Sequence, residues 1–290
     1  MALSADPFFH VQLEADKLLR ELEIDSLPID PFMIARRLDI ELLPLPAIEG
    51  GASGMLLHVN GVFGIGYPTY VDNEGFKNFS VGHEIGHYRL PGHPDAIFDD
   101  TGRHTSHAGF QSKDSYEREA DHFAAALLMP TKLFMEAAKR AGDGLKAIET
   151  LSDICRTSLE ATAIRFAVTS HEPVVVVLSH GQTIDYAFIS ESLKEFPGLD
   201  WICKGTPLPP ESVTSEFNSE RGNVENAERA DGTSTLQDWF NGPHRQEIFE
   251  EVIGLGAYGK TLTVLTGMES PDELENDDDS EEQWTPRFRR

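Results

Sequence analysis

The sequence predicts an α+β protein, in which helices and short β-hairpins occupy separate stretches of the chain. Several segments carry apolar residues at helical spacing, and two pairs of β-rich runs flank turn dipeptides. The 290 residues are 40% hydrophobic and 9% aromatic, which is ordinary for a globular protein. A chain of this length can bury a substantial core.

The first elements are expected to be two helices, Phe9–Leu22 and Pro31–Leu38. The former has apolar residues at helical spacing, and the latter begins with a proline, whose fixed φ suits a first helical turn. The runs Met55–Val59 and Val62–Ile65 enclose Asn60-Gly61. Because this pair favours a tight turn with positive φ, the two runs predict a β-hairpin.

The middle of the chain is expected to be mostly helical. One helix is predicted at Phe76–Leu90, where Pro91-Gly92 ends it, and another at Ser115–Met129, before Pro130. Residues 91–114 between them are rich in Gly, His and Asp and are expected to be irregular. The stretch Phe134–Phe166 continues with helical patterns.

The C-terminal part is predicted to form a small α/β unit. A second hairpin is expected from Val174–Leu178 and Thr183–Ile189, a helix at Trp239–Ile253 and a strand at Thr261–Leu265. The polar stretch 205–234 is expected to be a long loop.

Composition and motifs divide the chain into four predicted parts. These are a core at 1–130, a helical segment at 131–170, the α/β unit at 171–267 with its polar loop at 205–234, and a tail at 268–290. The tail holds nine acidic residues against three arginines, so we expect it to be disordered, with an acidic docking tail as the alternative.

Charge and cysteine content limit the class of protein. A net charge of −25 argues against general binding to nucleic acids or membrane surfaces, because both are polyanionic. The sequence has no basic and apolar leader pattern and no apolar run long enough to cross a bilayer. Cys155 and Cys203 are the only cysteines, which suits a reducing cytoplasm.

The residues that indicate chemistry are His83-Glu84-Ile85-Gly86-His87, an HExxH pattern on a predicted helix. Histidines at i and i+4 lie on one face, so both imidazoles can reach one Zn²⁺ ion. Glu84 projects sideways and can act as a general base on a water molecule. The alternative is two core histidines bonded to the backbone, but the helix is apolar on two sides, and burying such groups there is costly.

A third zinc ligand is expected from the helix at Ser115–Met129. Glu117 and Asp121 lie one turn apart at the edge of its apolar stripe. We predict that Glu117 is the third ligand and that Asp121 orients a ligand histidine by accepting a hydrogen bond. The alternative for both is a solvated helix shoulder.

Several other interpretations stay open. An oxyanion-stabilising residue is not identified by the motif, although five residues lie near it in sequence: Tyr88, His93, His104, His107 and Tyr116. A histidine of this group can also bind a second ion or occlude the zinc site. Cys203 can be a redox sensor or, more commonly, a small core residue. A closed structural zinc site is disfavoured because such sites are usually rich in cysteine.

The chain resembles the ImmA/IrrE family of zinc-dependent metallopeptidases. The resemblance rests on FSVGHEIGHYRL, at 79–90, and EREADHFAAALLMP, at 117–130. More loosely, it includes the leading helices and SGMLLHVNGVFGIGY, and it covers about residues 10–170. Asp121 stands where many relatives have Asn.

The resemblance implies a minimal zincin-like core with a small antiparallel sheet and an edge hairpin. It also implies one zinc ion per chain, held by His83, His87 and Glu117, with Glu84 as the base. The resemblance further implies that the protein cleaves a helix-turn-helix repressor. This cleavage would relieve repression of stress, DNA-damage or mobile-element genes. The alternative is a non-catalytic or sensor-type regulator that binds a repressor, or DNA, through the same fold.

Residues 151–166 resemble the helix-turn-helix-like segment that follows the core in this family. Direct DNA binding through this segment is disfavoured, because it offers only two arginines, Arg156 and Arg165. Packing, or docking of a repressor, is the favoured use.

Overall fold

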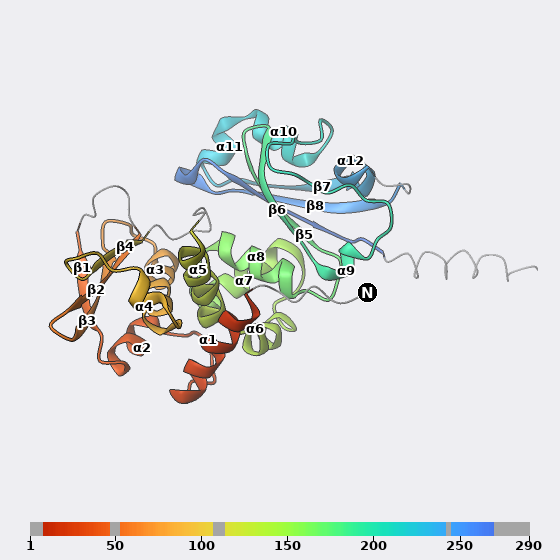
Figure 1. The fold of residues 1–290 in the computed structure, drawn as a ribbon. Coiled ribbons are helices and arrows are strands. Elements are labelled where there is room, and N and C mark those ends of the chain that lie inside the picture. The colour runs from red at the N-terminus through yellow and green to blue at the C-terminus, as the bar shows by residue number, and fades with distance from the viewer. Residues whose placement is uncertain (1–7, 47–52, 107–113, 242–244, 270–290) are drawn as a thin grey trace, which may run out of the picture. The chain divides into compact units, whose positions relative to one another are not determined.

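A computed structural model describes residues 8–46, 53–106, 114–241 and 245–269 of the chain (Figure 1). The chain forms two compact units. The first contains residues 1–142 and 147–162, and the second contains residues 143–146 and 163–290. The composition-based boundaries near residues 130, 170 and 267 stay predictions.

The two leading helices of the first unit are confirmed. Helix α1 (Phe9–Glu21) turns its apolar stripe, Val11, Ala15, Leu18 and Leu19, into the core. Helix α2 (Pro31–Arg37) begins after Asp30, whose carboxylate accepts hydrogen bonds from the backbone N–H groups of Phe32 and Met33 at 2.9 and 3.0 Å. Such a cap satisfies N–H groups that have no partner within the helix.

A four-stranded sheet follows, in the order β1-β3-β2-β4. Its strands are β1 (Glu41–Leu45), β2 (Gly54–Val59), β3 (Val62–Pro68) and β4 (Arg103–Ser106). The β2–β3 hairpin is confirmed, and Asn60 and Gly61 adopt φ values of 53° and 81°.

Two expectations about this sheet are wrong. It is mixed and not antiparallel, because β1 pairs with β3 in parallel. The hairpin is central and not at the edge, because β4 pairs with the free side of β2. Strand β4 and the short helix α4 (His93–Ala96) lie in the stretch expected to be irregular. The sequence of β4, Arg-His-Thr-Ser, has no apolar alternation to reveal it.

Helices α3 (Glu74–Arg89) and α5 (Ser115–Leu128) confirm the two predicted central helices. Helix α3 contacts β2 and β3 as well as α5. Leu56 and Ile65 of the sheet, Ile85 of α3 and Phe123 of α5 belong to one buried core. Helix α3 therefore presents side chains to two neighbours at once.

The predicted helical stretch contains α6 (Thr131–Ala138), α7 (Gly144–Cys155) and α8 (Leu159–Thr169). Arg156, with a φ of 54°, ends α7 in the left-handed region. The Thr157 and Thr162 hydroxyls are hydrogen-bonded at 2.7 Å, which ties the turn to α8.

The second unit is built on an antiparallel sheet in the order β6-β5-β9-β8-β7 (Figure 1). Its strands are β5 (Val175–His180), β6 (Thr183–Ile189), β7 (Arg229–Thr235), β8 (Glu247–Gly254) and β9 (Thr261–Thr266). Its short helices are α9 (Glu191–Lys194), α10 (Val213–Ser219), α11 (Arg221–Glu225) and α12 (Leu236–Phe240), with a 3₁₀ turn at Gly256–Tyr258. The second hairpin and the strand near residue 261 are confirmed.

The helix expected at Trp239–Ile253 is wrong. Helix α12 ends at Phe240, where Asn241 takes a φ of 53°, and β8 follows. Ile248 and Val252 are buried, but Phe249 between them is 60% exposed. A spacing of four between apolar residues fits both a helix and a strand. The apolar but exposed Phe249 also interrupts the alternation of apolar and polar residues that is typical of a strand.

The polar stretch 205–234 is not one long loop, because it contains α10, α11 and most of β7. Strand β7 is at the sheet edge, and its alternating burial leaves half of its side chains in solvent, so its sequence is polar. Met268, at the start of the predicted tail, is buried against the second unit, and residues 270–290 lie outside the described residues.

Candidate metal centre

Helix α3 places three polar side chains inside the first unit, and two of them face each other. His83, Glu84 and His87 are fully buried. The two imidazoles lie one helical turn apart, with 3.0 Å between their Nε2 atoms. In the described part of the chain, their ring nitrogens contact other side chains and not backbone carbonyls.

Helix α5 brings Glu117 to the same point. Its Oε2 atom lies 3.6 Å from Nε2 of His83, and its Oε1 atom lies 3.2 Å from Nε2 of His87. Ligand atoms at the corners of a tetrahedron around a zinc-sized ion are about 3.3 Å apart, because each bond is about 2.0–2.1 Å long. The separations between the three side chains are close to this value, although the two histidines are nearest to different oxygens of Glu117, so the three can contact one ion.

The electrostatics of these donors suit a cation. Burial lowers the pKa of His87 to about 3, so the ring is neutral and keeps a lone pair. Burial alone raises the pKa of Glu117, but hydrogen bonds with His104, His83 and His87 outweigh it and hold the pKa well below its usual range. Within the described residues, His83, His87 and Glu117 form the one group of three or more side chains placed to share a metal ion.

Asp121 lies behind His83. Its Oδ1 atom is 2.9 Å from Nδ1 of His83, and both side chains are fully buried. Burial alone lowers the pKa of His83, but hydrogen bonds to Asp121 and Glu117 raise it to about 10. Nδ1 of His83 therefore faces Asp121, and its Nε2 atom faces His87 and Glu117.

Glu84 is distinct from the three donors because neither of its carboxylate oxygens has a well-formed hydrogen bond within the described part of the chain. Burial raises its pKa to about 7, although the charge of His83 and the hydroxyl of Ser106 act to lower it. Gly54 of β2 lies beside this carboxylate, and a Cβ atom there would overlap Oε1 of Glu84. A buried carboxylate without a well-formed hydrogen bond is costly, and perturbed groups of this kind are common at functional sites.

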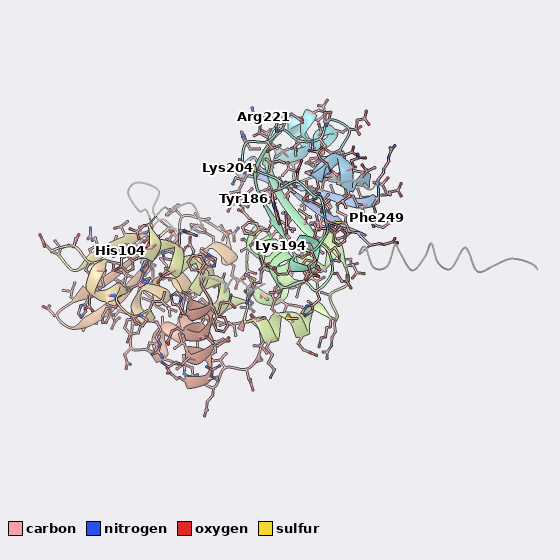
Figure 2. All side chains as sticks on the ribbon, turned by 45° about the vertical axis from the view of Figure 1, so that its right-hand side comes forward. His104, Tyr186, Lys194, Lys204, Arg221 and Phe249 are labelled. Atoms are coloured by element: carbon pink, nitrogen blue, oxygen red, sulfur yellow. The ribbon has the colours of Figure 1, made fainter. Side chains whose placement is uncertain are left out.

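The structure also brings His104 to the site. Its Nε2 atom lies 2.9 Å from Oε1 of Glu117, and its ring lies beside that of His87, with 4.6 Å between the centroids. Figure 2 marks the position of His104 in the first unit. Sequence reasoning left His104 among several nearby residues, because its position depends on the pairing of β4 with β2, which nothing local in the sequence reveals.

The other residues of that group have different positions. His93 is buried, with Nδ1 3.0 Å from Nδ1 of His87. Tyr116 packs edge-on against His93, and Tyr88 packs against Phe63 in the core. His107 lies outside the described residues.

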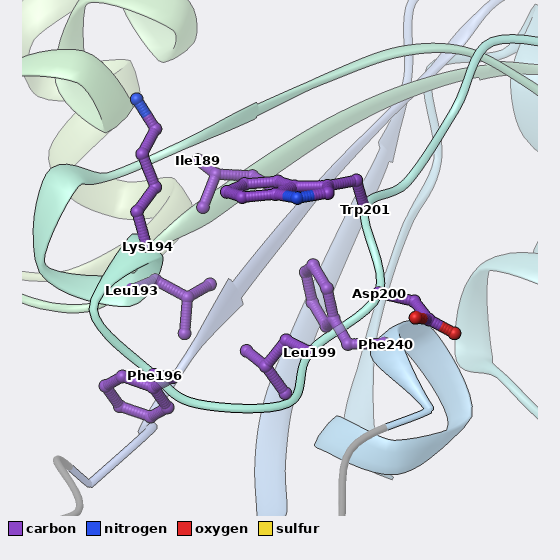
Figure 3. A pocket seen from close by; sticks show the side chains of 8 residues that line it. All are labelled: Ile189, Leu193, Lys194, Phe196, Leu199, Asp200, Trp201 and Phe240. Atoms are coloured by element: carbon purple, nitrogen blue, oxygen red, sulfur yellow. The ribbon is translucent and has the colours of Figure 1, made fainter. Parts of the chain in front are cut away.

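A small pocket in the second unit has a different character (Figure 3). It is lined by Ile189, Leu193, Lys194, Phe196, Leu199, Asp200, Trp201 and Phe240. In the figure, the charged ends of Lys194 and Asp200 point away from the apolar side chains. The lining therefore offers apolar contact and lacks the convergent ligands of the first unit. Cys203 is exposed beyond Trp201, and Cys155 is buried.

Comparisons with known proteins identify a family domain in the part of the chain that contains α3 and α5. Residues 69–167, which include α3 and α5, match the Peptidase_M78 family model, described as an IrrE N-terminal-like domain. No curated protein matches the chain. Among solved structures, a Mycobacterium tuberculosis transcriptional regulator has a similar fold, with a TM-score of 0.57 and 14% identity over 89% of this chain and 76% of that chain.

None of the described helices is both long enough and apolar enough to cross a membrane.

Proposed function

We propose that this chain, which carries a Peptidase_M78 domain of the ImmA/IrrE family at residues 69–167, is a zinc-dependent endopeptidase. The observation that carries the proposal is the triangle of His83, His87 and Glu117, with the unpartnered carboxylate of Glu84 on the same buried helix. A structural zinc site would need no such base and is usually closed by a fourth protein ligand.

One zinc ion per chain fits the donor set. Two imidazole nitrogens and one carboxylate are a common catalytic zinc set, in which the fourth position is left for water or substrate. When bound, zinc would polarise the scissile carbonyl as a Lewis acid and would lower the pKa of water, so that the nucleophilic hydroxide forms near neutral pH.

The protein's own residues supply the proton transfers and the alignment. Glu84 accepts a proton from the attacking water molecule and donates it to the amine that leaves. Asp121 keeps His83 in the tautomer that presents Nε2, through the 2.9 Å contact at Nδ1. The absence of a Cβ atom at Gly54 gives the Glu84 carboxylate the room that its task requires.

The proposed substrate is a helix-turn-helix transcriptional repressor, cleaved in the cytoplasm to relieve repression of stress, DNA-damage or mobile-element genes. Support comes from the family resemblance and from a fold similar to that of a transcriptional regulator. A dedicated protein substrate also suits a strongly acidic chain, whose net charge of −25 disfavours direct contact with DNA.

A second candidate function is regulation without cleavage, in which the same fold binds a repressor or DNA. The fold similarity to the Mycobacterium tuberculosis transcriptional regulator is the observation that favours this second candidate. The two functions differ in their dependence on Glu84, because only cleavage requires a base.

The test combines metal analysis with a cleavage assay. We expect one zinc per chain in wild type and in Glu84→Gln, little zinc in Glu117→Ala, and a full complement in Glu136→Ala, a control glutamate that is more than half exposed on α6. Co-expressed repressors are then assayed for cleavage by wild type and Glu84→Gln.

We expect Glu84→Gln to lose cleavage by about 10²- to 10⁴-fold, the usual contribution of a general base. Zinc binding with no cleavage of any co-expressed repressor would favour the second candidate function, regulation without cleavage. Wild type without metal would refute the ligand assignment.

A further inference from the structure

His93 connects the proposed metal site to the surface of α5. Its side chain is fully buried, with Nδ1 3.0 Å from Nδ1 of His87 and Nε2 3.1 Å from Oε2 of Glu119. The Glu119 side chain is 28% exposed. The three groups therefore form one continuous hydrogen-bonded chain that starts at a ligand and ends at a carboxylate near solvent.

The turn after α3 fixes the position of His93. Pro91-Gly92 ends the helix, Gly92 takes a φ of 86°, and the backbone N–H of His93 donates to the carbonyl of Leu90 at 3.2 Å. The ring of Tyr116 packs edge-on against the imidazole at a centroid distance of 4.9 Å. His93 is therefore held between α3 and α5 with both ring nitrogens engaged.

Only one arrangement of protons satisfies this chain and also frees His87 to bind a metal. A ligand at Nε2 must carry its proton on Nδ1, so His87 donates to Nδ1 of His93. A neutral His93 that accepts at Nδ1 carries its own proton on Nε2. That nitrogen faces Glu119, which can only accept when ionised.

We propose that His93 and Glu119 are positioning residues for His87, fixing the tautomer and ring orientation that present its Nε2 atom to the metal. The proposal rests on the proposed metal site and extends it. Asp121 contacts Nδ1 of His83 in the corresponding way, so each α3 histidine would have its own buried partner. The two histidines differ in their partners. His83 contacts the carboxylate of Asp121 directly, whereas His87 is connected to the carboxylate of Glu119 through the imidazole of His93.

The test measures zinc affinity by competition with a chromophoric chelator. His93→Phe keeps a ring of similar size but cannot accept from His87, and we expect zinc affinity to fall by about 10- to 100-fold. His93→Gln, whose amide can both accept and donate, should recover part of that loss. His180→Gln, which replaces an exposed histidine at the end of β5, is the control and should match wild type.

A second readout examines the metal-free protein, so it does not depend on the proposed activity. In ¹⁵N NMR spectra of wild type, we expect the His87 ring to show one tautomer, protonated at Nδ1. In His93→Phe we expect a mixture or the opposite tautomer, with urea unfolding like that of wild type. Glu119→Gln should have a smaller effect, because its amide oxygen can still accept.

These two readouts separate the failure of this proposal from that of the proposed function. An unchanged His87 tautomer and unchanged zinc affinity in His93→Phe would overturn the positioning role while leaving the metal site intact. If wild type binds no zinc, the proposed function fails, and so does the assignment of His93 and Glu119 to a metal ligand. A loss of affinity with a matching loss of folding stability would show a structural role only.

Discussion

At the scale of single residues, Gly54 and Glu84 show how a strand and a helix share one small space. Strand β2 passes so close to the carboxylate that any side chain would overlap it. The backbone of β2 therefore limits the space that the Glu84 carboxylate can occupy. This limited space has a direct experimental consequence.

We predict that Gly54→Ala lowers the proposed peptidase activity on the order of 100-fold, because the added methyl group displaces the Glu84 carboxylate from the position that the proposed reaction requires. Zinc content should stay at the wild-type level, since the displaced group is not a ligand. Gly64→Ala is the matched control in the same sheet, because a Cβ atom there would meet Leu43 at an ordinary 3.5 Å. Equal activities of the two variants would contradict the prediction.

Asp121 supports a second prediction at this scale. Asp121→Ala removes the acceptor for Nδ1 of His83, so we expect zinc affinity to fall by about 10- to 100-fold. Asp121→Asn keeps an oxygen acceptor and should retain most of the affinity. Chelator competition on both purified variants makes the measurement, and a similar loss in the two would show that acceptor geometry is not what matters.

At the scale of elements, the site depends on how closely α3 and α5 approach. Two glycines of α3 face α5. A Cβ atom at Gly86 would lie 3.1 Å from Phe123 and 3.2 Å from the backbone of Ala120, whereas one at Gly82 would lie 3.4 Å from Ala124. The backbone at Ala120 cannot rotate aside, so the two positions differ in what they tolerate.

We predict that Gly86→Ala decreases the free energy of unfolding by about 1–3 kcal/mol, because the overpacked contact outweighs the gain in helix propensity. Gly82→Ala should be neutral or stabilise by up to about 1 kcal/mol, since alanine favours the helix and the space is sufficient. Urea unfolding of the metal-free proteins provides the comparison. The opposite order of stability would mean that the interface adjusts at Gly86.

The same elements explain what could be predicted from the sequence. Helices α3 and α5 carry their apolar faces and ligand spacing within a few turns, so local periodicity revealed them. Strand β4 could not be predicted from local sequence, because its four residues are polar and its pairing with β2 joins positions nearly fifty residues apart. His104 and His93 were therefore left unassigned, as their contacts depend on that pairing and on the turn after α3.

The C-terminal misassignment has a different cause. Ile248 and Val252 occupy positions that a helix and a strand both allow, and only neighbours β7 and β9 decide between them. Long-range pairing of this kind leaves no mark in a short window of sequence. The polar sequence of β7 also gives no strand signal, because an edge strand need not be apolar.

At the scale of the whole molecule, the two compact units differ in what a metal ion can stabilise. All three donors belong to the first unit. A ligand that binds only the folded state stabilises it by about 2.7 kcal/mol at a free concentration of 100 times Kd. This stabilisation belongs first to the elements that carry the donors.

We predict that zinc slows amide hydrogen exchange in α3 and α5 and has little effect on β5 and β9 of the second unit. Hydrogen exchange followed by mass spectrometry, with and without a chelator, measures both units in one sample. His87→Ala, which lacks one donor, should remove the effect. Protection that increases equally in β5 and β9 would contradict a local role for the ion.

The spacing of the three donor side chains has one further consequence, for the choice among ions. The two Nε2 atoms lie 3.0 Å apart, and the nearest Glu117 oxygens lie 3.2 Å from His87 and 3.6 Å from His83, which suits an ion whose bonds are short. Calcium prefers six to eight oxygen ligands at about 2.3–2.6 Å, and magnesium retains its water in an octahedral shell. A buried site with two nitrogen ligands and one carboxylate therefore disfavours calcium and magnesium by ion size, coordination number and ligand type. Transition-metal ions are then the remaining competitors of zinc for this site.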